Sequence, residues 1–194
     1  MTRRSSAAAG HLAVVLLIVS AVAARGQVAL FGAYWENVAR AAAQGDPRQV
    51  QELLASGKSP NDTDNEEHTA LHVAAMNGNL QIAAIMIKAK AKLDPQDKLG
   101  HTPLHYAADR NHADVAKLLL DVGVAVDPEN RNGVTPLMLA ASRGNLDVIR
   151  VLLDKGANPT KTDFTGRDAI GWAADSHRPA VIQALKRAAN NKRS

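Results

Sequence analysis

The chain has 194 residues, a net charge of +4 at pH 7 and no cysteine, so its length fits one domain. A disulfide, a zinc–thiolate site and a cysteine nucleophile are therefore excluded within it. Only 3% of the residues are aromatic, which is too few for a base-stacking surface, and neither this composition nor the small charge indicates a nucleic-acid partner.

The first 24 residues are typical of a secretory signal peptide. Two arginines give a positive start, residues 12–19 form a continuous apolar run, and residues 21–24 are small. We expect cleavage after Ala23 or, preferably, Ala24, which would leave a periplasmic or secreted protein. The alternative is an uncleaved membrane anchor, but the apolar stretch that ends at Ala24 has 13 residues and a spanning helix needs about 20. A twin-arginine signal is disfavoured because serines follow the arginine pair.

Residues 25–35 form a short leader, of which we expect Trp35 to pack on the structure that follows. Beyond it, one segment returns every 33 residues. TALHVAA at 69–75 recurs as TPLHYAA at 102–108, as TPLMLAA at 135–141 and, in degraded form, as DAIGWAA at 168–174. A fixed period of this length indicates a solenoid, in which each unit buries its faces against its neighbours.

Each unit predicts two helices. Thr102 is placed as an N-cap and Pro103 occupies the first helical position, where a missing N–H is harmless. Residues 104–108 place apolar side chains at i, i+3 and i+4, with alanines that allow a neighbouring helix to approach closely. A second helix follows a turn at Asn111 and carries the apolar residues of 115–120. The unit is therefore a helix-turn-helix.

These residues resemble the ankyrin repeat, whose T-P-L-H-x-A-A signature is matched most closely by residues 100–108. The resemblance implies an all-α solenoid of about five 33-residue repeats with β-turn fingers. The predicted repeats are 36–61 as an N-terminal cap, 62–94, 95–127, 128–160 and 161–192 as a C-terminal cap. It also implies structural roles for the signature residues Thr69, His72, Thr102, Pro103, His105, Thr135 and Pro136. Glu67 stands where the turn glycine normally occurs, so we expect that turn to be distorted.

The histidine spacing superficially suggests a metal site. His68 and His72, like His101 and His105, are four residues apart, as zinc ligands on a helix often are. However, the first histidine of each pair precedes the N-cap and lies in a turn, and the resemblance implies that the second hydrogen-bonds to the signature threonine and neighbouring backbone. We therefore expect no metal.

We also expect no catalysis and no cofactor. The chain has no G-x-S-x-G elbow, P-loop or H-E-x-x-H motif. Asp62 and Asp64, like Asp94 and Asp97, form acidic pairs that could suggest catalytic carboxylates or calcium ligands. They recur because the turn between repeats uses Asp, whose side chain caps its own backbone.

Positions that vary between otherwise equivalent repeats are the candidates for a partner surface. In a stacked array, the turn tips and the exposed side of the first helices line up into a concave surface. The candidates are Asn65, Glu66, His68, Met76, Asn77, Lys98, Leu99, His101, Asp109, Arg110, Arg131, Asn132, Val134, Ser142, Arg143, Phe164 and Arg167. We expect at least half of them to be ordinary solvated surface, since few interface residues usually matter.

Charge is distributed unevenly along this surface. Glu66 and Glu67 make the first tip acidic, whereas later repeats are basic through Lys98, Arg110, Arg131, Arg143 and Arg167. We therefore expect a monomer that binds a protein partner with an acidic patch and makes an apolar contact near Leu99, Val134 or Phe164. With its signal, the chain is similar to small bacterial periplasmic ankyrin proteins, which implies a non-catalytic binding module or scaffold in the cell envelope. The alternatives are an exported effector acting on host proteins and a membrane-anchored scaffold.

Overall fold

The structure is a computed structural model that describes residues 37–174 and 178–191. The described residues belong to one compact unit, Asn37–Ser194. The predicted signal peptide at 1–24 and the leader at 25–35, including Trp35, lie outside the described residues. Within the described residues, no helix is both long enough and apolar enough to cross a membrane.

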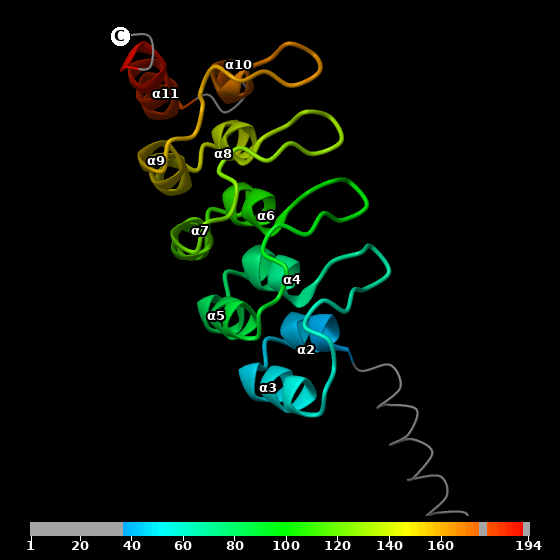
Figure 1. The fold of residues 1–194 in the computed structure, drawn as a ribbon. Coiled ribbons are helices and arrows are strands. Elements are labelled where there is room, and N and C mark those ends of the chain that lie inside the picture. The colour runs from blue at the N-terminus through cyan, green and yellow to red at the C-terminus, as the bar shows by residue number, and fades with distance from the viewer. Residues whose placement is uncertain (1–36, 175–177, 192–194) are drawn as a thin grey trace, which may run out of the picture. The chain divides into compact units, whose positions relative to one another are not determined.

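The described residues form ten helices arranged as five consecutive pairs. Their bounds are α2 Val38–Gln44, α3 Pro47–Ala55, α4 Ala70–Asn77, α5 Leu80–Lys88, α6 Pro103–Asp109, α7 Ala113–Asp121, α8 Pro136–Arg143, α9 Leu146–Asp154, α10 Ala169–Ala173 and α11 Pro179–Asn191. First helices pack on first helices and second helices on second helices, so each type forms its own row (Figure 1). The predicted all-α repeat solenoid is confirmed.

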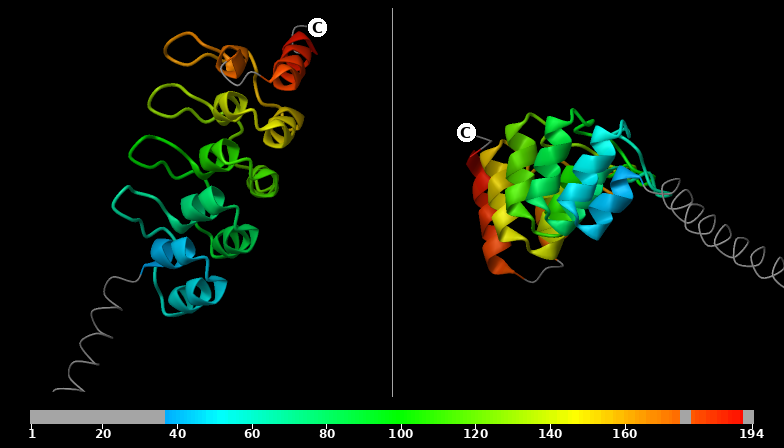
Figure 2. Two further views of the ribbon diagram at one scale, coloured as in Figure 1. Left: turned by 180° about the vertical axis from the view of Figure 1, so that it is seen from behind. Right: turned by 90° about the horizontal axis from the view of Figure 1, so that it is seen from below.

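Four long loops connect each second helix to the next first helix, and all four project on the same side of the stack (Figure 2). We call them fingers two to five, after the repeat that each one begins. Fingers two and five each contain an isolated antiparallel bridge, Thr63 to Thr69 and Thr162 to Asp168. The second helices lie on the opposite side, so the fingers and first helices share one face.

Short polar side chains start the first helices, including those of the two terminal repeats. Thr69 and Thr135 are N-caps whose hydroxyls each accept from a backbone N–H three residues later at 3.4 Å. Where the threonine is missing, Asn37 Oδ1 accepts from Arg40 N and Asp168 Oδ1 accepts from Gly171 N, both at 2.8 Å. The terminal repeats thus change the cap residue and retain the cap, whose removal typically costs about 1 kcal/mol.

The core between the two rows is aliphatic. Each alanine pair of the first four first helices is buried, from Ala41 and Ala42 to Ala140 and Ala141, and lets neighbouring helices approach closely. Second helices contribute larger side chains such as Leu119, which is fully buried. Burying one such leucine is worth roughly 1.5–3 kcal/mol, and each repeat adds several of these contacts.

The expectation that Glu67 distorts its turn is wrong. Glu67 has a φ of 67°, close to the 80° of Gly100 at the equivalent position of the next finger. Its N–H donates to the Asp64 carbonyl at 3.1 Å, matching the Gly100 bond to Asp97 at 2.9 Å. The turn therefore keeps its geometry, and the cost is steric, because a side chain in the left-handed region is disfavoured by about 1–2 kcal/mol.

Candidate partner-binding surface

One polar side chain at the base closes each finger. Asp97 Oδ1 accepts from Leu99 N at 2.8 Å and from His101 N at 2.9 Å. The same pair of bonds is made by the residues at the equivalent positions, Asp64, Asn130 and Asp163. The prediction that Asp64 and Asp97 cap their own backbone is therefore confirmed.

Asp94 has a different role from the one predicted. Its carboxylate accepts from Ala125 N of the following repeat at 3.1 Å. Asp127 repeats this bond one unit later by accepting from Asn158 N at 2.9 Å. This position therefore links successive repeats.

Neighbouring fingertips are tied together by backbone hydrogen bonds. The N–H groups of Lys98, Arg131 and Phe164 each donate to a carbonyl of the preceding finger, at 3.2, 3.2 and 3.1 Å. The acceptors are Glu66, Leu99 and Asn132. These bonds were not anticipated from the sequence, although the absence of insertions already placed the tips in register. They hold the tips as one continuous row.

The two signature histidines are structural. His105 Nδ1 accepts from Thr102 N at 3.1 Å, and its Nε2 donates to the Val134 carbonyl of the next repeat at 3.0 Å. His72 makes the corresponding contacts one repeat earlier. Burial lowers the pKa of His105 to about 4, which keeps the ring neutral and its Nδ1 an acceptor. Within the part of the chain that is described, no cluster of residues is suited to hold a metal ion.

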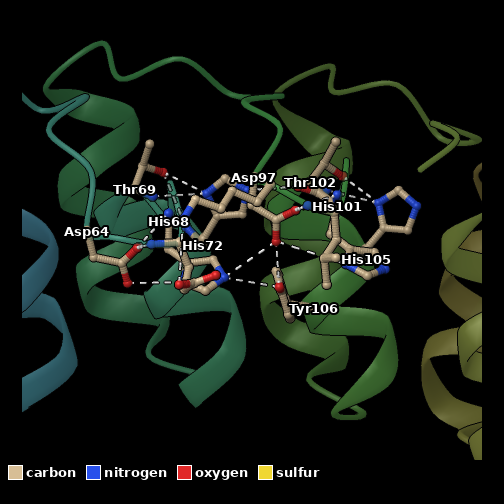
Figure 3. Close-up of polar contacts among 12 residues, drawn as sticks. Asp64, His68, Thr69, His72, Asp97, His101, Thr102, His105 and Tyr106 are labelled. Atoms are coloured by element: carbon tan, nitrogen blue, oxygen red, sulfur yellow. Dashed lines mark hydrogen bonds and ion pairs between the residues drawn. The ribbon is translucent and has the colours of Figure 1, made fainter. Parts of the chain in front are cut away.

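A polar network joins the bases of fingers two and three (Figure 3). His68 Nδ1 lies 3.0 Å from Asp64 Oδ2, and its Nε2 lies 3.1 Å from Tyr106 Oη. The Tyr106 hydroxyl donates to Asp97 Oδ2 at 2.5 Å. His68, which we predicted as a contact residue, is therefore engaged within the fold, and its side chain is only 18% exposed.

Asp97 remains ionised within this network. Burial alone would raise the pKa of Asp97, but hydrogen bonds from Tyr106, His101 N and Leu99 N outweigh it and hold the pKa below its ordinary value. Burial and the bond to Asp97 raise the pKa of Tyr106. His101 Nε2 accepts from Asn130 at 2.9 Å, and burial lowers the pKa of His101. Like His68, His101 thus belongs mainly to the internal network.

We define the finger face as the surface of residues 64–68, 97–101, 130–134 and 163–167 together with the first helices α4, α6, α8 and α10 and Arg110, the C-cap of α6. Eleven candidates on it are exposed, namely Asn65, Glu66, Asn77, Lys98, Leu99, Arg110, Arg131, Asn132, Arg143, Phe164 and Arg167. Five are half-buried, namely His68, Met76, His101, Asp109 and Ser142.

Val134 is a correction to the predicted apolar contacts. Its side chain is 5% exposed and belongs to the core. Its backbone N–H donates to Asn130 Oδ1 at 3.0 Å, and its carbonyl accepts from His105. The residue before the cap is pinned by these bonds, and an apolar side chain there packs inward.

Neighbouring carboxylates offset part of the positive charge on the finger face. Lys98 Nζ lies 3.7 Å from Glu66, and Arg143 Nε lies 2.8 Å from Asp109 Oδ1. Arg110 Nε lies 3.5 Å from the other oxygen of the same Asp109, so two guanidinium groups share one carboxylate. No carboxylate oxygen of the described residues lies within 4.0 Å of the Arg131 guanidinium. Positive charge therefore remains along repeats three to five.

The phenylalanine, tyrosine and tryptophan side chains of the described residues all lie on the finger face. Tyr106 and Trp172 are half-buried and Phe164 is 74% exposed. Trp172 Nε1 donates to Asp163 Oδ2 at 2.9 Å, repeating the bond from Tyr106 to Asp97 two repeats earlier. We did not predict Trp172 as a site residue. The sequence could have indicated it, because Tyr106 and Trp172 are aromatic at a position where repeats two and four have Val73 and Leu139.

Stacked helix pairs with hydrogen-bonded fingers define a repeat scaffold that presents one side-chain-rich face. A family model described as "Ankyrin repeats (3 copies)" matches residues 38–130 and 123–194. The chain belongs to the ankyrin repeat family. Ankyrin repeats are generally protein–protein interaction modules, and the family is typically non-catalytic.

Two proteins of Arabidopsis thaliana are similar to this chain over shorter segments. Serine/threonine-protein kinase 12 is 39% identical over 57 residues, and Potassium channel GORK is 38% identical over 58 residues. These segments cover 29% and 30% of this chain, and 12% and 7% of those proteins. The similarity therefore concerns a short part of each relative.

Proposed function

We propose that this protein is a non-catalytic binding module of the bacterial cell envelope that holds a protein partner against the finger face. The observation that carries the proposal is the separation of roles within each repeat. The alanine pairs and the aliphatic side chains of the second helices form the core, whereas Tyr106, Phe164, Trp172 and the variable charged residues lie on the finger face. Backbone bonds between neighbouring tips keep this face ordered before a partner arrives, which reduces the entropic cost of binding.

The proposed partner presents an acidic patch. Arg110, Arg131 and Arg143 are exposed, and the carboxylate of Asp109 offsets only part of their charge. Leu99 is 61% exposed and Phe164 is 74% exposed, so both tips can supply apolar contact. Complementary charge would speed the encounter, and the apolar tips would contribute area removed from water.

A cross-linked pull-down from fractionated bacterial cells tests the proposal. The bait would be the native chain, compared with the double variant Arg110→Glu/Arg131→Glu. The matched control Arg48→Glu/Arg150→Glu reverses two exposed arginines on the second helices α3 and α9. We expect one envelope protein to be captured by the native chain and the control, and to be lost from the finger-face variant.

The recovered bait also reports on location through its intact mass. A bait that begins near Arg25 would support removal of the signal and a periplasmic module. An uncut bait in the membrane would favour the anchored scaffold, and recovery with a host protein would favour the exported effector. Equal capture by both double variants would contradict the finger face as the binding surface.

A further inference from the structure

We propose that the fifth repeat, together with the tip of finger four, anchors the partner, and that Phe164, Trp172, Arg167 and Arg131 together take a partner segment in which an apolar side chain is flanked by carboxylates. This inference rests on the proposed function and narrows it. It assigns most of the affinity to one end of the finger face. It also commits to one occupant, an acidic protein segment with an apolar residue inside it.

Arg167 and Trp172 are held together by one buried carboxylate. The Arg167 guanidinium carbon lies 4.3 Å from the centre of the Trp172 ring, in a cation–π arrangement. Arg167 Nε lies 3.7 Å from Asp163 Oδ2, the same oxygen that accepts from Trp172 Nε1 at 2.9 Å. Thr165 Oγ1 accepts from Arg167 Nε at 3.3 Å. The two side chains are therefore positioned by the fold, so a partner would not have to order them.

Asp163 is suited to this positioning role because it stays ionised. Burial would by itself raise the pKa of Asp163, but hydrogen bonds from Thr165, Arg167 N and Trp172 outweigh it and lower the pKa to about 2. Asp163 is 5% exposed, so its charge is turned toward Arg167 and Trp172 and away from solvent. The ring and the guanidinium would remain fixed over the whole physiological pH range.

Phe164 and Arg131 both lie against the preceding finger. A Cβ built on Gly133 would be 2.6 Å from Phe164 Cδ1, so the phenyl ring rests on that glycine. A Cβ built on Gly100 would be 3.0 Å from Arg131 Cγ, so Arg131 occupies the equivalent place one repeat earlier. The two side chains therefore hold equivalent places in successive fingers; the Phe164 ring is exposed, and no carboxylate of the described residues pairs with Arg131.

Fingers two and three lack this combination of an exposed aromatic ring and an exposed arginine. Lys98 is paired with Glu66, and Glu67 adds a second negative charge at that finger. The Tyr106 hydroxyl is engaged by Asp97 and His68. Tryptophan, tyrosine and arginine dominate interface hot spots, and cations next to rings favour acidic segments with an apolar residue. The fifth repeat is where these residue types meet.

A selection from phage-displayed random peptides tests the inference. The full-length chain would be immobilised through one biotin on Gln51→Cys, which is exposed on α3 and unique because the chain has no native cysteine. We expect enriched peptides in which Asp or Glu flank Phe, Leu or Trp. The most enriched peptide would then be synthesised and titrated by fluorescence anisotropy.

Matched variants locate the binding energy. Phe164→Ala and Arg131→Ala should each weaken the synthetic peptide at least about tenfold, whereas Leu80→Ala, at an exposed leucine of the second helix α5 and off the finger face, should change its Kd less than about twofold. Trp172→Leu copies the residue at the equivalent position of repeat four and should weaken binding. Trp172→Tyr recreates the tyrosine–aspartate bond of repeat three and should retain most of it. Circular dichroism of each variant checks the fold.

Two kinds of result would overturn the inference. Peptides that lose binding on Arg110→Glu but not on Phe164→Ala or Arg131→Ala would leave the proposed function standing and refute the anchor in repeat five. Enrichment of basic peptides, or no enrichment at all, would also refute it. If the pull-down partner is likewise indifferent to every finger-face variant, the proposed function fails as well.

Discussion

Acid should destabilise this fold mainly through the buried signature histidines. Burial lowers the pKa of His105 from 6.5 to about 4, so between these values the unfolded chain binds more protons than the folded one. Stability therefore falls as the pH falls through this window. For one such group the loss is roughly 2.5 kcal/mol at about pH 4.5, and it approaches about 3 kcal/mol at lower pH.

The hydrogen bonds of His105 explain why stability falls as the pH falls. The neutral ring of His105 accepts from Thr102 N at Nδ1 and donates to the Val134 carbonyl at Nε2. A second proton would place an N–H opposite the N–H of Thr102 and add a charge to the core. The lowered pKa of His72 acts in the same sense. The lowered pKa of Asp97 matters only at more acidic pH, because its ordinary value is 3.8.

Urea unfolding at several pH values, followed by far-UV circular dichroism, measures the effect. The informative variant is His105→Met, because repeat four has Met138 at this position, where the sulfur lies 3.4 Å from Thr135 N. The variant should lose less free energy of unfolding than the native chain between about pH 6.5 and 4.5. Equal losses in the two proteins, or a flat native profile across this range, would refute the reasoning.

Three further changes have definite expected outcomes. Glu67→Gly should raise the free energy of unfolding by roughly 1 kcal/mol in urea titrations by relieving a left-handed φ of 67°; a decrease would contradict the assigned strain. Gly133→Ala should lower it by about 1–3 kcal/mol because its φ is 74° and its Cβ meets Phe164, and an unchanged melting temperature would argue against both causes. Arg110→Glu with Arg131→Glu should slow association and flatten its salt dependence in surface plasmon resonance, and unchanged kinetics would count against charge steering.

The helices could be predicted from the sequence because local rules agree in every repeat. Thr-Pro marks the same helix start twice, and the alanine pair follows at the spacing that faces a neighbouring helix. Even the degraded last repeat retains a cap in Asp168, which accepts from Gly171 N at 2.8 Å. A rule that needs only a few adjacent residues is readable one repeat at a time, and the 33-residue period then supplies the packing.

Side-chain exposure on the fingers could not be predicted in the same way. His68, His101, Val134 and Arg167 occupy equivalent positions, yet Val134 is buried, the two histidines are 18% exposed at the side chain and Arg167 is exposed. At this position the polarity and size of the side chain decide whether it packs in the core, joins a polar network or stays in solvent. That outcome depends on contacts with the neighbouring repeat.

Comparison between equivalent positions separates residues needed by the fold from residues that the fold leaves unexplained. Trp172 replaces aliphatic residues of other repeats, but its bond to Asp163 gives it a structural task. Phe164 stands where other fingers have Lys98 or Arg131, and its backbone makes the same bond to the preceding tip as theirs do. The ring remains 74% exposed, so folding gains little from it, while water contact with so much apolar surface is unfavourable. This unexplained exposure is the reason that we propose Phe164 as a residue covered by the partner.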